Sequence, residues 1–358
     1  FDLPMDCQMI KIFNIYLIKR SFYFSFTILI SFGLLDSIFT FISELENISP
    51  QFNIFIIFKH VIFSMPHNCV QFLEGACLLG VILALGISHQ EGNLNVLRSA
   101  GESPLKIIFI SSIGALMLAI PLIAFDEISF RKIYLNSEAN KNILSQKNVS
   151  SNKDITWIKS DNSYLSFENI IDDDIFNVRF IKTDNNEIVY TATANSAKIS
   201  ENKIVFSNNT LYKNFANDSL KTKSEIFTIP IQSKVALKNI NHLGIKNIYS
   251  YQKFFSESIL EKDVLFKAHL DKVFYRTIFI PISIMALIIY FGSLIFTSLR
   301  DSTVGGRIVV AVIGAFIYKL LQDLSIGVFI SYGFPVYLGA ILPSIILFFM
   351  SIRAYQKI

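Results

Sequence analysis

The chain has 358 residues, of which 52% are hydrophobic, 14% are aromatic and only 17% are charged, with a formal net charge of +4. A soluble protein of this length needs more charge to cover its surface, so this composition excludes an ordinary soluble enzyme and indicates an integral membrane protein. The three cysteines, Cys7, Cys69 and Cys77, all precede the polar middle of the chain, so that part is expected to fold without disulfides.

Six apolar stretches are long enough to be transmembrane helices, which need about 20 residues because each residue rises only about 1.5 Å. They cover residues 21–42, 66–87, 107–125, 277–299, 308–324 and, after a short loop at 332–335, the run to 352. Residues 52–65 are interrupted by Lys59 and His60 and are predicted to form an interfacial or packing helix. We expect no cleavable signal peptide and a start near Met9.

Basic residues gather in alternate connections between these spans, which predicts the orientation of the chain. They are Lys11, Lys19, Arg20, Arg98, Lys106, Arg300, Arg307, Arg353 and Lys357. Because Lys and Arg favour the cytoplasmic side, both termini are predicted to be cytoplasmic. The domains are then residues 9–130 with three spans, residues 131–267 on the far side of the membrane, and residues 268–358 with three more spans.

The polar middle of the chain has the pattern of a β domain. Between residues 156 and 235, short runs of alternating polarity are separated by turns rich in Asn, Asp and Ser. This pattern predicts a sandwich or roll of antiparallel strands. The flanking residues 130–146 and 250–267 are predicted to be helical stalks.

Motifs for catalysis, nucleotide binding and metal binding are absent from the sequence. The chain has no P-loop, no H-E-x-x-H and no metal-spaced group of Cys or His, and the aspartates at 172–174 are typical of a solvated turn. We therefore expect neither an enzyme active site nor a cofactor bound by this chain.

Several short motifs, taken in their order, resemble a known family. They are EGACLLG (74–80), LRSAGES (97–103), RDS (300–302), GGRI (305–308), YGFP (332–335) and Leu342-Pro343-Ser344. With six spans split three and three around a β insert, the chain resembles the LptF/LptG family of lipopolysaccharide export permeases, and its closing motifs resemble the LptG branch.

The resemblance implies a subunit of an ABC transporter in the bacterial inner membrane that extracts lipopolysaccharide. The implied partners are an LptF-like permease chain, an LptB-like ATPase dimer that uses ATP, an LptC-like jellyroll protein and membrane lipids, with no nucleic acid. The insert would be a periplasmic β-jellyroll that passes acyl chains to the next jellyroll.

The resemblance also predicts a coupling helix near residues 90–102 that binds the ATPase. Its candidate residues are Glu91, Asn93, Leu97, Arg98 and Gly101. Asn93 stands where the family has Glu, and Glu91 is the candidate replacement in the salt bridge to the ATPase. Gly101 is expected to end the helix in a left-handed conformation. The alternative is an amphipathic interfacial loop in which Arg98 only follows the charge bias.

Lipopolysaccharide carries phosphates above its acyl chains, so cations at the periplasmic rim are candidate ligands. These candidates are Arg131, Lys132, Lys272, Arg276 and Lys319. Snorkelling at a helix end is the alternative for the first four. Because a charge inside a span indicates function, Lys319 and Asp323 are expected to act at the cavity or at the partner subunit; the alternative is a self-satisfied i, i+4 pair. Glu74 in the second span is expected to face the same cavity or to cap a kink near Pro66. Thr40 occupies a position where the family often has Lys, between Asp36 and Glu44.

Two other functions fit the same residues. One is a permease for another lipid or a lipoprotein. The other is a membrane-anchored scaffold whose β domain recruits envelope proteins without transport. Co-purification of an ATPase distinguishes transporters from a scaffold, and the identity of the bound lipid distinguishes the two permeases.

Overall fold

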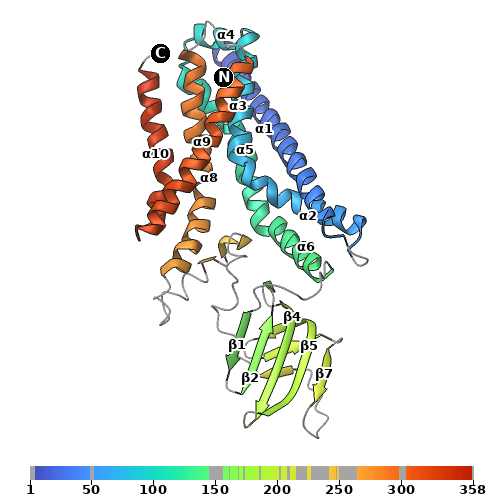
Figure 1. Ribbon diagram of the computed structural model, residues 1–358. Helices are drawn as coiled ribbons and strands as arrows, with labels where there is room; N and C mark the ends of the chain where they lie inside the picture. Colours follow the sequence, from blue (N-terminus) through green and yellow to red (C-terminus); the bar gives the residue numbers. More distant parts are fainter. Residues whose placement is uncertain are drawn as a thin grey trace. The chain divides into compact units, whose positions relative to one another are not determined.

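The computed structural model describes most of the chain. The described residues are 5–48, 52–144, 156–160, 162–167, 169–171, 174–184, 187–200, 203–207, 210–214, 224–226, 242–246, 248–249, 264–297 and 304–356. Within them, six helices are long and apolar enough to cross a membrane: Ile12–Leu45, Ile54–Gln90, Pro104–Glu138, Lys267–Phe296, Gly305–Ser331 and Val336–Tyr355. An antiparallel sheet lies between the third and fourth of these along the chain (Figure 1). The prediction of a membrane protein with six apolar helices and a β domain in the middle is confirmed.

The chain forms two compact units. The first contains Phe1–Phe39, Met65–Phe130 and Ile248–Ile358, and the second contains Thr40–Ser64 and Arg131–Asn247. The sheet belongs to the second unit, which therefore includes residues 40–64 from the N-terminal part of the chain as well as the polar insert.

The helices agree with the predicted order but differ at several boundaries. They are α1 (Met5–Leu45), α2 (Ile54–Cys69), α3 (Leu73–Gln90), α4 (Asn93–Ser99), α5 (Pro104–Phe125), α6 (Arg131–Leu144), α8 (Val264–Thr297), α9 (Val304–Ser331) and α10 (Val336–Tyr355). The first helix begins at Met5, before the first predicted span at residue 21. The predicted stalk before the sheet is α6, which follows α5 through one π-helical turn at Asp126–Phe130. Most of the second predicted stalk lies outside the described residues.

The predicted boundary between the packing helix and the second span is wrong. Helix α2 runs through Pro66 to Cys69, and the break falls at the 3₁₀ turn Val70–Phe72. Proline removes one backbone hydrogen bond, but neighbouring helices in a membrane satisfy the freed carbonyl, so a helix continues past it. The two helices together form one 37-residue apolar stretch, Ile54–Gln90.

Helix α3 is the central element of the helical unit. It packs against α4, α5, α8 and α9, and most of its side chains are buried. Two glycines let α1 approach this bundle closely. A Cβ added at Gly80 would lie 2.4 Å from the backbone nitrogen of Ser25, and one added at Gly114 would lie 2.3 Å from the carbonyl oxygen of Ile18. Small residues of this kind allow membrane helices to pack backbone against backbone.

The second unit contains an eight-stranded antiparallel sheet. Its strands are β1 (Thr156–Ser160), β2 (Ser163–Phe167), β3 (Asn169–Ile171), β4 (Asp174–Asp184), β5 (Glu187–Ser200), β6 (Lys203–Phe206), β7 (Leu211–Asn214) and β8 (Ser224–Ile226). The order is β1-β2-β4-β5-β6-β8, with β3 also pairing with β4 and β7 with β5. The longest strand, β5, pairs with β4 on one side and with both β6 and β7 on the other.

One face of the sheet holds the core of the second unit. Side chains alternate along the strands, so that in β6 Ile204 and Phe206 are buried while Lys203 and Val205 are exposed. The buried side chains include Leu165, Phe167, Val178, Phe180, Tyr190 and Ile204. This one-sided burial is what the period-two pattern of the sequence predicts.

Candidate functional site

Helix α4 is a short helix between α3 and α5, with both ends defined by glycine. Gly92 precedes it with φ of +79°, and Gly101 follows it with φ of +88°. The amide of Glu102 donates to the carbonyl of Leu97, and that of Gly101 donates to the carbonyl of Arg98. These two bonds form a Schellman motif, which needs a left-handed residue where glycine stands. The predicted left-handed end of the helix at Gly101 is confirmed.

The two faces of α4 have different neighbours. Leu94 and Leu97 are 0% and 2% exposed and belong to the core of the helical unit. Asn95, Val96 and Arg98 are exposed, and the Val96 side chain is 49% accessible. Leu97, predicted to contact the ATPase, therefore anchors α4 to the bundle. Val96 is the apolar residue that α4 presents outward. The i, i+3 spacing of Leu94 and Leu97 places both leucines on one face of α4, and this spacing could have indicated that Val96 lies on another face.

Arg98 lies at the exposed end of the same helix. Its guanidinium carbon is 6.0 Å from the centre of the Phe296 ring on α8. A cation over an aromatic face at this distance is attracted to it, so Phe296 helps to orient Arg98. Because Arg98 is exposed, its guanidinium N–H groups can donate hydrogen bonds to a protein that binds α4.

Glu91, whose contact with the ATPase stays a prediction, binds Arg20 on α1. Arg20 Nη2 donates to Glu91 Oε1 at 2.8 Å, and Arg20 Nη1 donates to Glu91 Oε2. Tyr16 and Asn93 donate to the same Glu91 Oε2, at 3.2 and 2.9 Å. Asn93 thus joins this network. Hydrogen bonding to Arg20 holds the pKa of the Glu91 carboxyl below its usual range.

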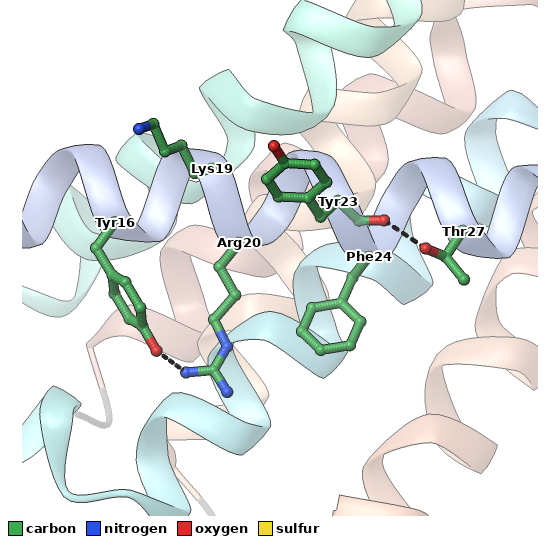
Figure 2. Close-up of a pocket in the computed structure, with 6 residues that line it drawn as sticks. All are labelled: Tyr16, Lys19, Arg20, Tyr23, Phe24 and Thr27. Atoms are coloured by element: carbon green, nitrogen blue, oxygen red, sulfur yellow. Dashed lines mark hydrogen bonds between the residues drawn. The ribbon is translucent and has the colours of Figure 1, made fainter.

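A shallow groove of about 380 Å³ runs along α1 at this point (Figure 2). It is lined by Tyr16, Lys19, Arg20, Tyr23, Phe24 and Thr27. Figure 2 shows that Tyr16 and Arg20 extend from one side of α1, while Lys19 extends from the other. Lys19 is exposed.

Lys319 and Asp323 on α9 each pair with a residue of another helix and not with each other. Lys319 Nζ lies 3.1 Å from Glu74 Oε2 on α3, and Arg276 Nη1 on α8 lies 3.7 Å from Asp323 Oδ1. The alternative of a self-satisfied pair is wrong because residues of neighbouring helices are the partners, and the role at the cavity or at the partner subunit stays a prediction. The acidic partners also make Lys319 and Arg276 less available to a phosphate, whereas the described contacts give Lys272, on α8, no such partner.

Sequence reasoning missed a second polar cluster next to Lys319. The Tyr318 hydroxyl donates to Ser283 Oγ at 2.7 Å and lies 2.8 Å from Ser344 Oγ, joining α8, α9 and α10. Gln322 Nε2 contacts Ser283 Oγ at 3.5 Å. Tyr318 and Gln322 have i, i+4 spacing on α9, which could place them on one face of that helix. Their partners Ser283 and Ser344 lie on other helices, and spacing along one helix does not identify such partners.

The remaining predicted cations belong to the second unit and have different environments. Arg131 is 7% exposed and donates a hydrogen bond to the carbonyl oxygen of Leu243. Lys132 is exposed. In the same unit, Lys141 Nζ lies 2.6 Å from Glu44 Oε1, a pair that the sequence did not predict. Of these cations, Lys132 is the better placed to bind an added anion.

The described residues contain no group of three or more His, Cys, Asp or Glu side chains that could hold a metal ion. Asp174 begins β4, while residues 172 and 173 lie outside the described part of the chain.

The comparisons with known proteins agree with the motifs. A family model described as "Lipopolysaccharide export system permease LptF/LptG" matches residues 15–357. The lipopolysaccharide export system permease protein LptG of Haemophilus influenzae is 27% identical over 341 residues, which cover 88% of this chain and 90% of that protein. LptG of Escherichia coli strain K12 is 22% identical over 310 residues, covering 82% of this chain and 83% of that protein. The chain belongs to the LptF/LptG family of lipopolysaccharide export system permeases.

Proposed function

We propose that this chain is an LptG-type permease subunit of an ABC transporter that extracts lipopolysaccharide from the bacterial inner membrane. The observation that carries the proposal is the family match over residues 15–357. Six apolar helices and a β domain in the middle of the chain support it, because an amphiphile needs an apolar environment for its tails and a route out of the bilayer.

ATP hydrolysis belongs to a partner in this proposal, an LptB-like dimer on the cytoplasmic side. The geometry of α4 supports a contact there. Its inner face anchors it to the bundle through Leu94 and Leu97, and its outer face presents Val96 and Arg98. A short helix fixed to two spans can convert closure of the ATPase dimer into movement of those spans.

The proposal places both termini in the cytoplasm and the sheet in the periplasm. There the sheet acts as a jellyroll that receives acyl chains and passes them to an LptC-like jellyroll. An LptF-like chain completes the cavity. The apolar inner face of the sheet, with Phe167, Phe180 and Phe206 among its side chains, supports contact with acyl chains.

Lys132 and Lys272 are the candidate phosphate ligands that the contacts favour. Both are outside the ion pairs described above, whereas Arg276 and Lys319 already have acidic partners. Replacing both lysines with Gln is expected to weaken lipopolysaccharide binding more than replacing Arg131, whose guanidinium already donates to Leu243.

Purification with the neighbouring permease and ATPase in mild detergent tests the whole proposal. We expect an ATPase and bound lipopolysaccharide, identified by mass spectrometry, in the complex. A complex with an ATPase but with another lipid or a lipoprotein would contradict the substrate. A monodisperse chain that purifies without any ATPase would contradict the transporter assignment.

Substitutions on α4 test the coupling surface. Val96→Glu and Arg98→Glu are expected to reduce the amount of co-purified ATPase, because they place a charge in an apolar contact and reverse a cation. Gln356→Glu is the matched control, since it adds a charge at the exposed C-terminal end of α10, on the same proposed side of the membrane. Full recruitment by both α4 variants would refute the coupling surface.

A further inference from the structure

The joint between α3 and α4 is tied to α1 through a set of polar contacts. Glu91 is the residue between Gln90, which ends α3, and Gly92, which precedes α4. Its carboxylate binds both terminal nitrogens of Arg20, and Arg20 Nη1 also contacts Tyr16 and Ser88, the latter at 3.2 Å. Asn93, the first residue of α4, donates to the same carboxylate. We call these five residues, Tyr16, Arg20, Ser88, Glu91 and Asn93, the α1–α4 clamp.

The geometry of the clamp restricts rotation as well as separation. A guanidinium that donates two parallel bonds to one carboxylate fixes the direction between the two groups, which a lysine does not. The Arg20 side chain is 13% exposed and lies between the helices, whereas the Glu91 side chain is 44% exposed, so the restraint comes from the two-bond geometry more than from burial. The pair therefore resists sliding of α1 along α3 more than a single solvated ion pair would.

The backbone at Glu91 is where α4 changes direction relative to α3. Glu91 caps the end of α3, and Gly92 adopts a left-handed conformation immediately after it. Asn93, the first residue of α4, donates through Nδ2 to Glu91 Oε2 at 2.9 Å, so a swing of α4 about Gly92 pulls on the Glu91 carboxylate through Asn93. Because the carboxylate is bound to Arg20, the N-terminal half of α1 must follow, or the clamp must break.

Helix α1 is positioned to respond to such a pull. Only 17% of its most apolar stretch is buried, against 67% for the stretch that contains α3. Its close backbone contacts, Ser25 at Gly80 and Ile18 at Gly114, flank Arg20 in the sequence. The rest of α1 presents large apolar side chains outward, including Ile30, Leu34 and Ile38. The clamp is thus the polar attachment of α1 next to α4, while farther along α1 Asp36 accepts a hydrogen bond from Asn68 Nδ2 on α2 at 3.1 Å.

We propose that Arg20 and Glu91 are positioning residues that make α1 move with α4, so that displacement of α4 reaches the transmembrane cavity through the first helix. This inference rests on the proposed function, because it takes the ATPase as the source of the displacement. It also assigns Glu91 an intramolecular role in place of a contact with the ATPase.

Spin labels on α1 and α5 test the inference in the purified complex. One label replaces Ile38, which is 55% exposed on α1, and the other replaces Met117, which is 58% exposed on α5. In the parent complex we expect the distance between them to change when a non-hydrolysable ATP analogue is added. In Arg20→Gln and in Glu91→Gln, the ATPase is expected to stay bound while this change is lost. Lipopolysaccharide transferred per ATP is expected to fall about fivefold or more, the usual range of coupling between sites.

The charge-reversed double variant, Arg20→Glu with Glu91→Arg, is the rescue. It restores an ion pair between the same two positions and is expected to recover much of the distance change, which a merely local loss of stability would not explain. Arg20→Lys keeps the positive charge but cannot donate two parallel hydrogen bonds to the Glu91 carboxylate, so it is expected to retain less of the distance change than the charge-reversed pair. Should Arg20→Gln fail to give a monodisperse complex, Arg20→Lys and Glu91→Gln carry the test.

Three results would overturn the inference. The distance change could persist in both single variants, the reversed pair could fail to restore it, or Glu91→Gln could lose the ATPase, which would return Glu91 to the interface with that protein. A parent complex with no ATPase or no lipopolysaccharide would instead contradict the proposed function, so the two failures are distinguishable.

Discussion

At the scale of single residues, the Lys319–Glu74 pair makes a prediction about stability. The Glu74 side chain is 8% exposed and lies in an apolar helix, so Lys319→Met would leave a buried carboxylate without its cation. Removing one partner of a buried pair costs about 3–5 kcal/mol, whereas replacing both can be nearly neutral. We expect Lys319→Met to lower the thermal midpoint in detergent and Lys319→Met with Glu74→Gln to recover most of it. Equal losses in the single and double variants would contradict the pairing.

The same pair shows how far the sequence could predict the site. Lys319 and Asp323 stand out because charges within an apolar span are rare, and the sequence places both on one helix. Their partners depend on which helices pack together: Glu74 lies 245 residues from Lys319 in the chain, and Arg276 lies on α8. Spacing along one helix carries no information on such contacts. The family resemblance predicts an ATPase contact for Leu97 and Glu91, and it too carries no information on their neighbours within this chain.

At the scale of helices, the close approach of α1 to the bundle depends on glycine. A Cβ at Gly80 would overlap the backbone of Ser25, so α1 and α3 would have to separate. We expect Gly80→Ala to lower the thermal midpoint, by a destabilisation of about 1–3 kcal/mol, because overpacking cannot be relieved by moving a flexible side chain. Gly327→Ala on α9 is the control, since nothing lies within 4 Å of its added Cβ. There the midpoint should rise slightly, because alanine favours a helix by about 0.5–1 kcal/mol. A similar loss in both variants would contradict the packing explanation, because no atom lies within 4 Å of a Cβ added at Gly327.

Helices were the most predictable elements, and their ends were less so. The loop at residues 332–335, helix α4 and its end at Gly101 follow from local rules of apolar length and glycine conformation. Pro66 shows where a local rule fails. Proline predicts a boundary in water, yet in an apolar stretch the helix continues, and the break occurs at Val70–Phe72. The close contacts at Gly80 and Gly114 could not be predicted, because they require knowledge of which backbone lies opposite.

At the scale of the whole molecule, the export function requires the sheet and α4 to face opposite sides of the membrane. The sheet lies between the third and fourth apolar helices along the chain, and α4 lies between the second and third. An odd number of crossings separates them, so if α4 faces the cytoplasm, the sheet must face the periplasm. The distribution of Lys and Arg predicts that α4 faces the cytoplasm, since Arg98 and Lys106 lie in this connection.

Labelling of single introduced cysteines tests this topology directly. Leu211 on β7 is 76% exposed and Ser99 on α4 is exposed, so both positions accept a reagent. In a background where Cys7, Cys69 and Cys77 are replaced by Ser or Ala, we expect a membrane-impermeant maleimide to label Leu211→Cys in cells with a permeabilised outer membrane. Ser99→Cys should react only after the inner membrane is broken. Labelling of both positions in intact spheroplasts would place the sheet and α4 on the same side, and a lipid could not then pass from a cavity driven by α4 to the sheet.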